Sequence, residues 1–181
     1  MSGKPAGSRR RTIALIGLRG SGKTAVGRIL ADLLHGQCID VDEVIQRELK
    51  LSIREIFERE GERGFRRRER EVIAKIASSP PAVVSVGGGA VLDEANAEVL
   101  AKMATVVWLT APAQVLWERI STDPKTAGSR PSLTDLSGVA ELEQLATQRR
   151  TSYERAADLV IETEGLSPSQ VAQAILDVVT S

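Results

Sequence analysis

The sequence predicts an α/β fold, a three-layer α/β/α sandwich built on a central five-stranded parallel sheet. Short apolar runs alternate with segments of helical period, which is the order expected of βαβ units. Several of these runs are almost continuously apolar, as in strands that helices cover on both faces. The predicted strands span residues 12–16, 37–39, 82–86, 105–109 and 159–161.

Helix-start signals support this division of the chain. Ser52 and Glu55 have the spacing of a capping box, Asp93 can cap a helix over residues 94–103, and Pro112 sits where a helix can begin. The last predicted helix carries an apolar stripe along one side. The stripe consists of Val171, Ala174, Ile175, Val178 and Val179.

A glycine-rich motif directly follows the first predicted strand. It fits the phosphate-loop pattern G-x-x-x-x-G-K-[ST] at every fixed position and precedes a helical segment over residues 25–34. In this pattern backbone N–H groups surround the β-phosphate, Lys23 reaches the β- and γ-phosphate oxygens, and the Thr24 hydroxyl can ligate Mg²⁺. A helix N-terminus further favours bound phosphates. The sequence therefore predicts the use of a nucleoside triphosphate. The nucleotide-binding residues predicted in the motif are Gly20, Ser21, Gly22, Lys23, Thr24 and Ala25.

Composition limits the other possibilities. With 181 residues, 42% of them hydrophobic, the chain suits one globular domain, predicted over residues 12–181. Residues 1–11 are rich in Gly, Ser and Arg, lack the apolar segment of a secretory signal, and are expected to form a flexible basic tail. Lys plus Arg and Asp plus Glu number 24 each, so no overall field favours nucleic acid or a membrane surface. No apolar run approaches the ~20 residues that span a bilayer.

The chain has a single cysteine, Cys38, which can form no internal disulfide. Its apolar neighbours indicate a buried structural thiol rather than a nucleophile. We therefore expect a cytoplasmic protein.

The residues just after the strands form the expected binding edge, because ligands of open parallel sheets sit beyond the carboxyl ends of the strands. Asp40 and Asp42 follow the second strand, and in an extended chain residues two apart point the same way. They are predicted to serve Mg²⁺ and an accepting hydroxyl, respectively. The third strand is followed by Gly87, Gly88 and Gly89, which leave space and backbone N–H groups for a ligand. Phosphate-loop enzymes often carry a metal-holding Asp at such a strand end. Glycines stand there instead, so Asp40 is the best candidate for the Mg²⁺ shell.

Two basic clusters raise the question of anion binding. Arg66, Arg67 and Arg68 lie together in one predicted helix, and Arg149 and Arg150 lie in a later one. Such runs usually form a solvated helix face paired with nearby Glu. If one guanidinium from each cluster converges beside the three glycines, the two form a bidentate clamp for a carboxylate.

Residues 122–137 fit neither strand nor helix, because they are polar and interrupted by two prolines and a glycine. A loop of that length in a compact domain is more often functional than idle. The segment is predicted to be a mobile lid over the nucleotide, since phosphoryl transfer has to exclude water.

Together these motifs resemble the shikimate kinase family, within the nucleoside-monophosphate-kinase-like group of phosphate-loop folds. The resemblance covers nearly the whole chain after the tail. Its most specific parts are Gly17-Leu18-Arg19-Gly20-Ser21-Gly22-Lys23-Thr24, Ile39-Asp40-Val41-Asp42, Ser52-Ile53-Arg54-Glu55-Ile56-Phe57, Gly61-Glu62 followed by Phe65-Arg66, Ser85-Val86-Gly87-Gly88-Gly89-Ala90, and Arg130-Pro131. The resemblance implies ATP-dependent phosphorylation of the shikimate 3-hydroxyl, in chorismate and aromatic amino-acid biosynthesis, by a monomer.

The resemblance also implies how the acceptor binds. Asp42, Arg66, Gly88 and Arg149 match positions that contact shikimate in the family. Asp42 would face the reacting hydroxyl, and the two arginines would hold the carboxylate. Glu69 matches a residue that orients Arg66.

On the nucleotide side, Arg130 matches a lid arginine that moves onto the phosphates, and Arg119 matches a position beside the adenine. Residues 162–168 would form the adenine loop. Catalysis is expected to depend on Lys23, Asp42 and Arg130.

Two departures from the family pattern stand out. Family members usually show Arg-x-Pro-Leu-Tyr in the late helix, whereas the Pro-Leu pair is replaced here by Thr151 and Ser152. This leaves Arg149 and Arg150 as alternatives for the clamp, and the spacing to Tyr153 favours Arg149. The lid is also longer before its arginine than is typical.

Two other functions stay open. One is a phosphate-loop kinase of another acceptor, such as gluconate or a nucleoside monophosphate, which an acceptor panel with ATP would identify. The other is a non-catalytic ligand-sensing domain, which would be expected to lose phosphoryl-transfer residues. Those residues are all present: Lys23, Thr24, Asp40, Asp42 and Arg130.

Overall fold

The computed structural model describes residues 12–123 and 136–180. The predicted tail lies outside the described residues, as does Ser181. Most of the predicted lid, including Arg130, also lies outside them.

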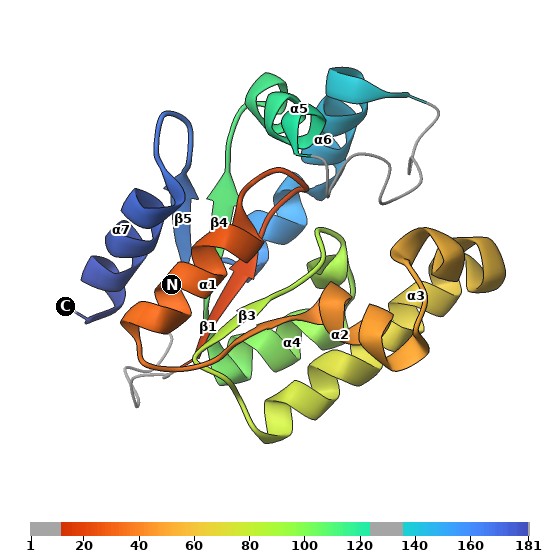
Figure 1. Cartoon of the computed structure of the whole chain (residues 1–181), viewed down its shortest axis with the longest axis horizontal. Helices are drawn as coiled ribbons and strands as arrows, with labels where there is room; N and C mark the ends of the chain where they lie inside the picture. Colours follow the sequence, from red (N-terminus) through yellow and green to blue (C-terminus); the bar gives the residue numbers. More distant parts are fainter. Residues whose placement is uncertain (1–11, 124–135, 181) are drawn as a thin grey trace.

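Five parallel strands form one sheet in the order β2-β3-β1-β4-β5 (Figure 1), which confirms the predicted architecture. The central strand pairs with β3 through Ile13 and Val83 and with β4 through Ile13 and Thr105. The first strand has the predicted bounds. The bounds of β2, β3 and β4 differ from the prediction by one residue at each end, and those of β5 differ by one residue at its C-terminal end. The strands are β1 (Thr12–Ile16), β2 (Cys38–Asp40), β3 (Val83–Ser85), β4 (Ala104–Thr110) and β5 (Leu159–Glu162).

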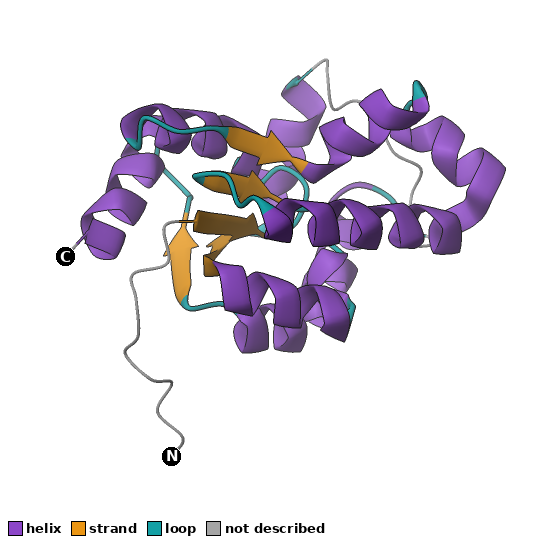
Figure 2. Cartoon of the chain, turned by 90° about the horizontal axis from the view of Figure 1, so that it is seen from below, coloured by secondary structure: helices purple, strands orange, loops and turns teal. Residues whose placement is uncertain are grey.

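Helices cover both faces of the sheet, and Figure 2 shows them on either side of the strands. One face packs against α1 and α7, and the other against the remaining helices. A short 3-10 helix, η1 (Ala90–Leu92), follows the three glycines. The helices are α1 (Lys23–Leu33), α2 (Val41–Leu49), α3 (Ile53–Ser78), α4 (Glu94–Met103), α5 (Ala113–Thr122), α6 (Gly138–Ala156) and α7 (Pro168–Thr180).

The central strand shows why the core has two halves. Successive side chains of a strand point to opposite faces. Ile13 and Leu15 therefore belong to the cluster shared with α1 and α7, while Ala14 and Ile16 belong to the larger cluster on the other face. Every residue of β1 is buried, which explains its continuously apolar sequence.

Local signals start the helices where they were predicted. The Ser52 hydroxyl accepts from the Glu55 backbone N–H at 3.2 Å, and the Glu55 carboxylate accepts from the Ser52 N–H at 2.8 Å, which completes the capping box. Asp93 caps α4, and Pro112 precedes the first residue of α5. The long α3 is interrupted at Gly61, whose φ of 67° and ψ of −179° leave the helical region. The residues after this break form a separate helical segment that carries Arg66.

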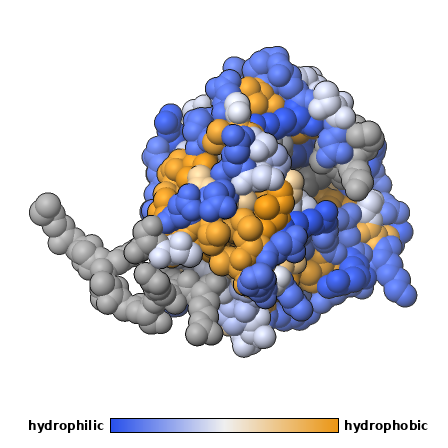
Figure 3. Space-filling model, turned by 60° about the vertical axis from the view of Figure 1, so that its left-hand side comes forward, coloured by the Kyte–Doolittle hydropathy of each residue, from blue (hydrophilic) through white to orange (hydrophobic). Residues whose placement is uncertain are grey.

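Figure 3 views the side of the molecule on which β5 and α7 lie, and apolar residues gather there among hydrophilic ones. Val160 of the edge strand β5 and Val178 of α7 are 51% and 55% exposed. Within residues 12–123 and 136–180, none of the helices is both long enough and apolar enough to cross a membrane.

Candidate active site

The phosphate loop runs from the end of β1 into α1, and its backbone needs glycine. Gly20 adopts a φ of 82°, a region that side-chain-bearing residues rarely enter. A Cβ at this position would also lie 2.6 Å from the carbonyl oxygen of Leu116 in α5. The loop conformation is thus fixed by its own backbone and by close packing against α5.

Lys23, the first residue of α1, folds its side chain back over this loop. Its Nζ donates to the carbonyl oxygens of Gly17 at 2.8 Å and Leu18 at 2.9 Å. The ammonium group therefore lies at the mouth of the loop, where the helix N-terminus adds its own positive field. Both features favour a polyphosphate.

Thr24 and Asp40 bring two oxygen donors together beside the loop. The Thr24 Oγ1 donates to Asp40 Oδ2 at 2.8 Å. The other carboxylate oxygen, Oδ1, accepts from the backbone N–H groups of Asp42 at 3.0 Å and Glu43 at 3.3 Å. Asp40 is thus held in place as the N-cap of α2 while one oxygen faces Thr24. A hydroxyl and a carboxylate are ligands that Mg²⁺ takes together with water and phosphate oxygens, so this pair fits the ion.

The predicted conformation of the Asp40–Asp42 segment was wrong. The chain does not stay extended through Asp42, because α2 begins at Val41. An Asp after a strand can cap a helix by accepting backbone N–H groups, and this local bond wins over continued extension. Asp42 therefore projects from the first turn of α2 and not from the strand end.

The three glycines after β3 form the centre of a second group of side chains, which we call the triglycine cluster: Asp42, Arg66, Glu69 and Arg149 around Gly87, Gly88 and Gly89. A Cβ on Gly87 would lie 2.5 Å from Glu69 Oε1 and 3.3 Å from Asp42 Oδ1. A Cβ on Gly88 would lie 3.2 Å from Arg149 Nη1. One on Gly89 would overlap the Arg66 guanidinium. Each glycine thus gives a charged side chain the room to approach the backbone.

Only one arginine of the first basic cluster reaches the glycines. Arg66 donates to Glu69 Oε2 at 2.8 Å and to Glu62 Oε1 at 3.1 Å, and its side chain is 20% exposed. Arg67 and Arg68 instead form ion pairs with Glu60, each at 3.2 Å. Of the three arginines, Arg66 is therefore the one whose side chain α3 directs toward the glycines.

The second basic cluster divides in the same way. Arg149 is 7% exposed and lies against Gly88, whereas the side chain of Arg150 is 72% exposed and pairs with Glu154 at 2.9 Å. The geometry thus separates the two alternatives that the sequence left open. The guanidinium groups of Arg66 and Arg149 lie on neighbouring glycines.

Glu69 is fully buried beneath these arginines. Burial raises the pKa of its carboxyl, and the neighbouring Arg66 and Arg149 guanidinium groups only partly oppose this effect. Its Oε1, which faces Gly87, has no hydrogen-bond partner among the described residues. Burial also opposes the charge of Arg66, but Glu69 and Glu62 outweigh it and raise the pKa of that guanidinium. Arg66 is therefore firmly cationic.

Arg119 connects the phosphate loop to the segment after β5. It donates to Thr163 Oγ1 at 2.9 Å and to the Thr163 carbonyl at 2.7 Å, and it reaches the Gly20 carbonyl at 3.4 Å. Thr163 is 2% exposed and falls within the predicted adenine loop. Arg119 thus ties that loop to the phosphate loop, a contact that the sequence did not indicate.

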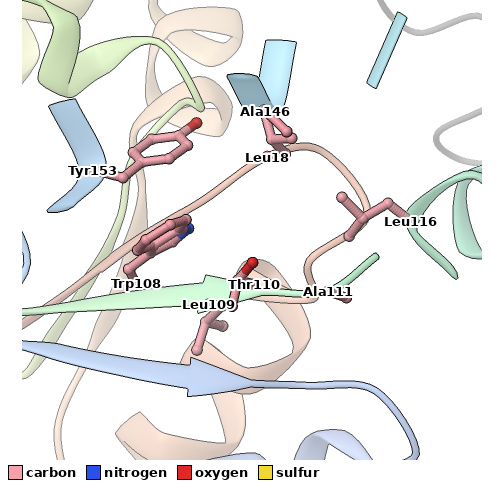
Figure 4. Close-up of a pocket in the computed structure, with 8 residues that line it drawn as sticks. All are labelled: Leu18, Trp108, Leu109, Thr110, Ala111, Leu116, Ala146 and Tyr153. Atoms are coloured by element: carbon pink, nitrogen blue, oxygen red, sulfur yellow. The ribbon is translucent and has the colours of Figure 1, made fainter. Parts of the chain in front are cut away.

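A cavity of about 30 Å³ lies behind the phosphate loop (Figure 4). It is far smaller than the roughly 300 Å³ or more of a typical ligand site, so it is not an acceptor pocket. Its mainly apolar lining consists of Leu18, Trp108, Leu109, Thr110, Ala111, Leu116, Ala146 and Tyr153.

Cys38 belongs neither to the phosphate-loop residues nor to the triglycine cluster. Burial, followed by the nearby Asp40 carboxylate, raises the pKa of its thiol to about 11. A thiol that holds its proton so firmly is a poor nucleophile. Among the described residues, no three His, Cys, Asp or Glu side chains form a metal-binding group.

A parallel sheet with a phosphate loop after its first strand, and a cluster of carboxylate and guanidinium groups beside that loop, defines a phosphate-loop kinase. The sequence model of the shikimate kinase family matches residues 19–180. A shikimate kinase of Symbiobacterium thermophilum is 39% identical over 165 residues, which make up 91% of this chain and 94% of that protein. The chain therefore belongs to the shikimate kinase family.

Solved structures agree with this membership. Shikimate kinase from Acinetobacter baumannii in complex with shikimate superposes with a TM-score of 0.86 at 36% identity, covering 93% of this chain and 92% of that one. Shikimate kinase from Aquifex aeolicus gives a TM-score of 0.78 at 34% identity, covering 93% and 96% of the two chains.

Proposed function

We propose that the protein transfers the γ-phosphoryl group of ATP to the 3-hydroxyl of shikimate, giving shikimate 3-phosphate and ADP. The observation that carries the proposal is the triglycine cluster, in which side chains from α2, α3 and α6 converge next to the phosphate loop. Family membership and the relative bound to shikimate support the choice of acceptor.

The triglycine cluster suits a compact polyol that bears a carboxylate. Arg66 and Arg149 would bind the carboxylate with charge-assisted hydrogen bonds, and Gly87, Gly88 and Gly89 would let the ring approach the backbone. Glu69 would hold Arg66 in position through its 2.8 Å bond. Asp42, from the first turn of α2, would bind the hydroxyl that reacts.

The phosphate loop would bind ATP on the other side of the acceptor. Lys23 would exchange its bonds to the loop carbonyls for phosphate oxygens, and residues 20–25 would surround the phosphates. Thr24 and Asp40 would hold Mg²⁺, which supplies charge neutralisation on the transferring phosphates when bound. Arg119 would border the adenine site from its anchored position on Thr163.

The reaction needs placement more than covalent chemistry. The bond between the γ-phosphorus and the bridging oxygen of ADP breaks as the bond to the shikimate oxygen forms, and the hydroxyl proton passes to the Asp42 carboxylate. Negative charge spreads over the equatorial oxygens in the transition state. Lys23 would stabilise that charge, and Arg130, which lies outside the described residues, is proposed to add a second cation on the strength of the family resemblance.

Measurement of ADP formation on adding shikimate to the protein with ATP and Mg²⁺ tests this proposal, with quinate and gluconate as alternative acceptors. The Asp42→Asn variant, purified in parallel, reveals any contaminating kinase. We expect shikimate-dependent turnover that Asp42→Asn reduces by about 10²-fold or more. Turnover with gluconate but not shikimate, or equal rates for the variant, would reject the proposal.

A monomeric, cytoplasmic enzyme is part of the same proposal. Sedimentation velocity checks the monomer, and a dimer would point to the exposed apolar residues of β5 and α7.

A further inference from the structure

Tyr153 lies on the buried side of α6, one helical turn after Arg149. Residues four apart share a helix face, and the side chains of both are directed inward, with exposed fractions of 1% and 7%. The Tyr153 ring packs on the Trp108 indole of β4, with ring centroids 5.3 Å apart and planes at 38° (Figure 4). The ring is therefore fixed, and with it the position of the hydroxyl.

The Tyr153 hydroxyl contacts two members of the triglycine cluster, Gly88 and Arg149. It donates to the Gly88 carbonyl oxygen at 2.5 Å. The Arg149 guanidinium interacts with the same hydroxyl by charge and by a side-chain hydrogen bond. A Cβ on Gly88 would lie 3.2 Å from Arg149 Nη1 and 3.4 Å from Tyr153 Oη, so the three groups meet at one point.

The chemistry of the hydroxyl suits this double contact. Burial raises the pKa of Tyr153, and Arg149 opposes that effect without reversing it. The hydroxyl therefore stays protonated. It donates a hydrogen bond to the Gly88 carbonyl oxygen, and its lone pairs can accept from the Arg149 guanidinium. A phenylalanine ring would offer the same packing surface to Trp108 but neither contact.

Gly88 is also the point at which the triglycine segment meets the phosphate loop. A Cβ there would lie 3.1 Å from the Gly17 carbonyl oxygen, so the two backbones are in close contact. A group that holds the Gly88 carbonyl in place therefore also holds the triglycine segment in place relative to the phosphate loop.

We propose that Tyr153 is a positioning residue for the acceptor, because its hydroxyl holds the Gly88 carbonyl and the Arg149 guanidinium in the arrangement that binds the acceptor's carboxylate. This inference rests on the proposed function. It concerns the acceptor, since the side-chain partners of Tyr153 described above are Gly88, Arg149 and Trp108, none of which is proposed to bind the nucleotide phosphates.

The test is the Tyr153→Phe variant, which keeps the ring. We expect its KM for shikimate to rise by about 3- to 10-fold, the loss of roughly one net hydrogen bond, while its KM for ATP stays within about twofold of wild type. Thr151→Ala, which removes an exposed hydroxyl from the same helix, is the matched control and should leave both constants unchanged.

A double-mutant cycle shows whether the hydroxyl acts through Arg149. In an Arg149→Ala background, Tyr153→Phe should raise KM for shikimate by less than about twofold further. The inference is overturned if Tyr153→Phe leaves KM for shikimate unchanged, raises both KM values equally, or has its full effect without Arg149.

The wild-type protein separates this failure from that of the proposed function. If the wild-type protein phosphorylates shikimate and Tyr153→Phe has the same KM for shikimate, only the inference about Tyr153 is rejected. If wild type fails to phosphorylate shikimate, the proposed function falls and the inference falls with it.

Discussion

The phosphate loop and the triglycine segment are both rich in glycine, but for different physical reasons. In the phosphate loop Gly20 has a φ of 82° and faces a backbone oxygen, so glycine is needed for conformation. In the triglycine segment Gly89 has an ordinary φ of −106°, and glycine is needed because the Arg66 guanidinium occupies the space of a side chain. The first loop is proposed to bind phosphates with its own backbone, and the second makes room for side chains from elsewhere.

The two sides of the proposed site, the phosphate loop for the nucleotide and the triglycine cluster for the acceptor, are therefore built differently. The nucleotide side is local, since a strand, a loop and a helix follow each other in the sequence. The acceptor side is assembled from α2, α3 and α6 around a loop, and it depends on buried charge. Mutations should therefore separate the two sides cleanly.

The largest expected effect is on the nucleotide side. Lys23→Met should lower kcat by about 10³-fold, because it removes a cation from the transferring phosphates. Shikimate binding in the absence of nucleotide should be unchanged, since Lys23 donates to the phosphate-loop carbonyls of Gly17 and Leu18 and is proposed to bind the nucleotide. Steady-state kinetics and calorimetric titration of shikimate measure the two quantities. A large loss of shikimate affinity would mean that the two sides are not separate.

The next effect compares two adjacent arginines on the acceptor side. Arg149→Ala should weaken shikimate binding by about 10- to 100-fold, because it removes a charge-assisted bond in a buried place. Arg150→Ala is the matched control, and its exposed pair with Glu154 predicts almost no change in binding. Shikimate titrations of both variants check this, and equal losses for the two would contradict the selection of Arg149.

A smaller effect sharpens the contrast between the glycines. Gly89→Ala places a methyl group against the end of a flexible arginine side chain, so it should fold normally and weaken shikimate binding by about 10-fold by displacing Arg66. Gly20→Ala meets backbone and a positive φ, so it should cost roughly 1–3 kcal/mol of stability and weaken ATP binding.

Urea unfolding and ligand titrations of the two glycine variants give the comparison. A Gly89→Ala protein that loses as much stability as Gly20→Ala, with shikimate binding intact, would show that both glycines are conformational.

The smallest effect concerns the pH dependence of stability through Glu69. Its folded pKa lies above the ordinary value of 4.5, mainly because of burial, so the folded state holds this proton more tightly than the unfolded state. The resulting stabilisation is complete below that value and is lost as the pH rises through the folded pKa. The free energy of unfolding of wild type relative to Glu69→Gln should therefore fall from pH 4 to pH 8. Urea unfolding at several pH values measures it, and a rise over this range would contradict the direction.

Much of the fold could be predicted because its determinants are local. The apolar runs, the Ser52 capping box and the phosphate-loop motif each require only a few neighbouring residues. The break of α3 at Gly61 was not predicted, because one glycine in a helical pattern is usually tolerated. The extended conformation expected at Asp42 failed for a local reason as well, since the Asp40 side chain competes for the backbone N–H groups.

The acceptor side could be predicted only in part. The residues alone raised the possibility that one arginine of each cluster faces the glycines, and only the family resemblance pointed to Arg66. The direction of the Arg66 side chain depends on how α3 is rotated against the sheet. The role we propose for Tyr153 could not be found from the sequence, because its hydrogen-bond partner Gly88 lies 65 residues away. The only sequence signal was that Tyr153 follows Arg149 by four residues, which places the two side chains on the same face of a helix.

The central claim is that Arg66 of α3 and Arg149 of α6, which lie against the triglycine segment, recognise a carboxylate. Calorimetric titration of the wild-type protein with shikimate and with shikimate methyl ester tests it most directly, because only the charge of the ligand changes. We expect the ester to bind about 10²-fold more weakly, since Arg66 and Arg149 would lose their charged partner. Equal affinity for the two ligands would contradict the account.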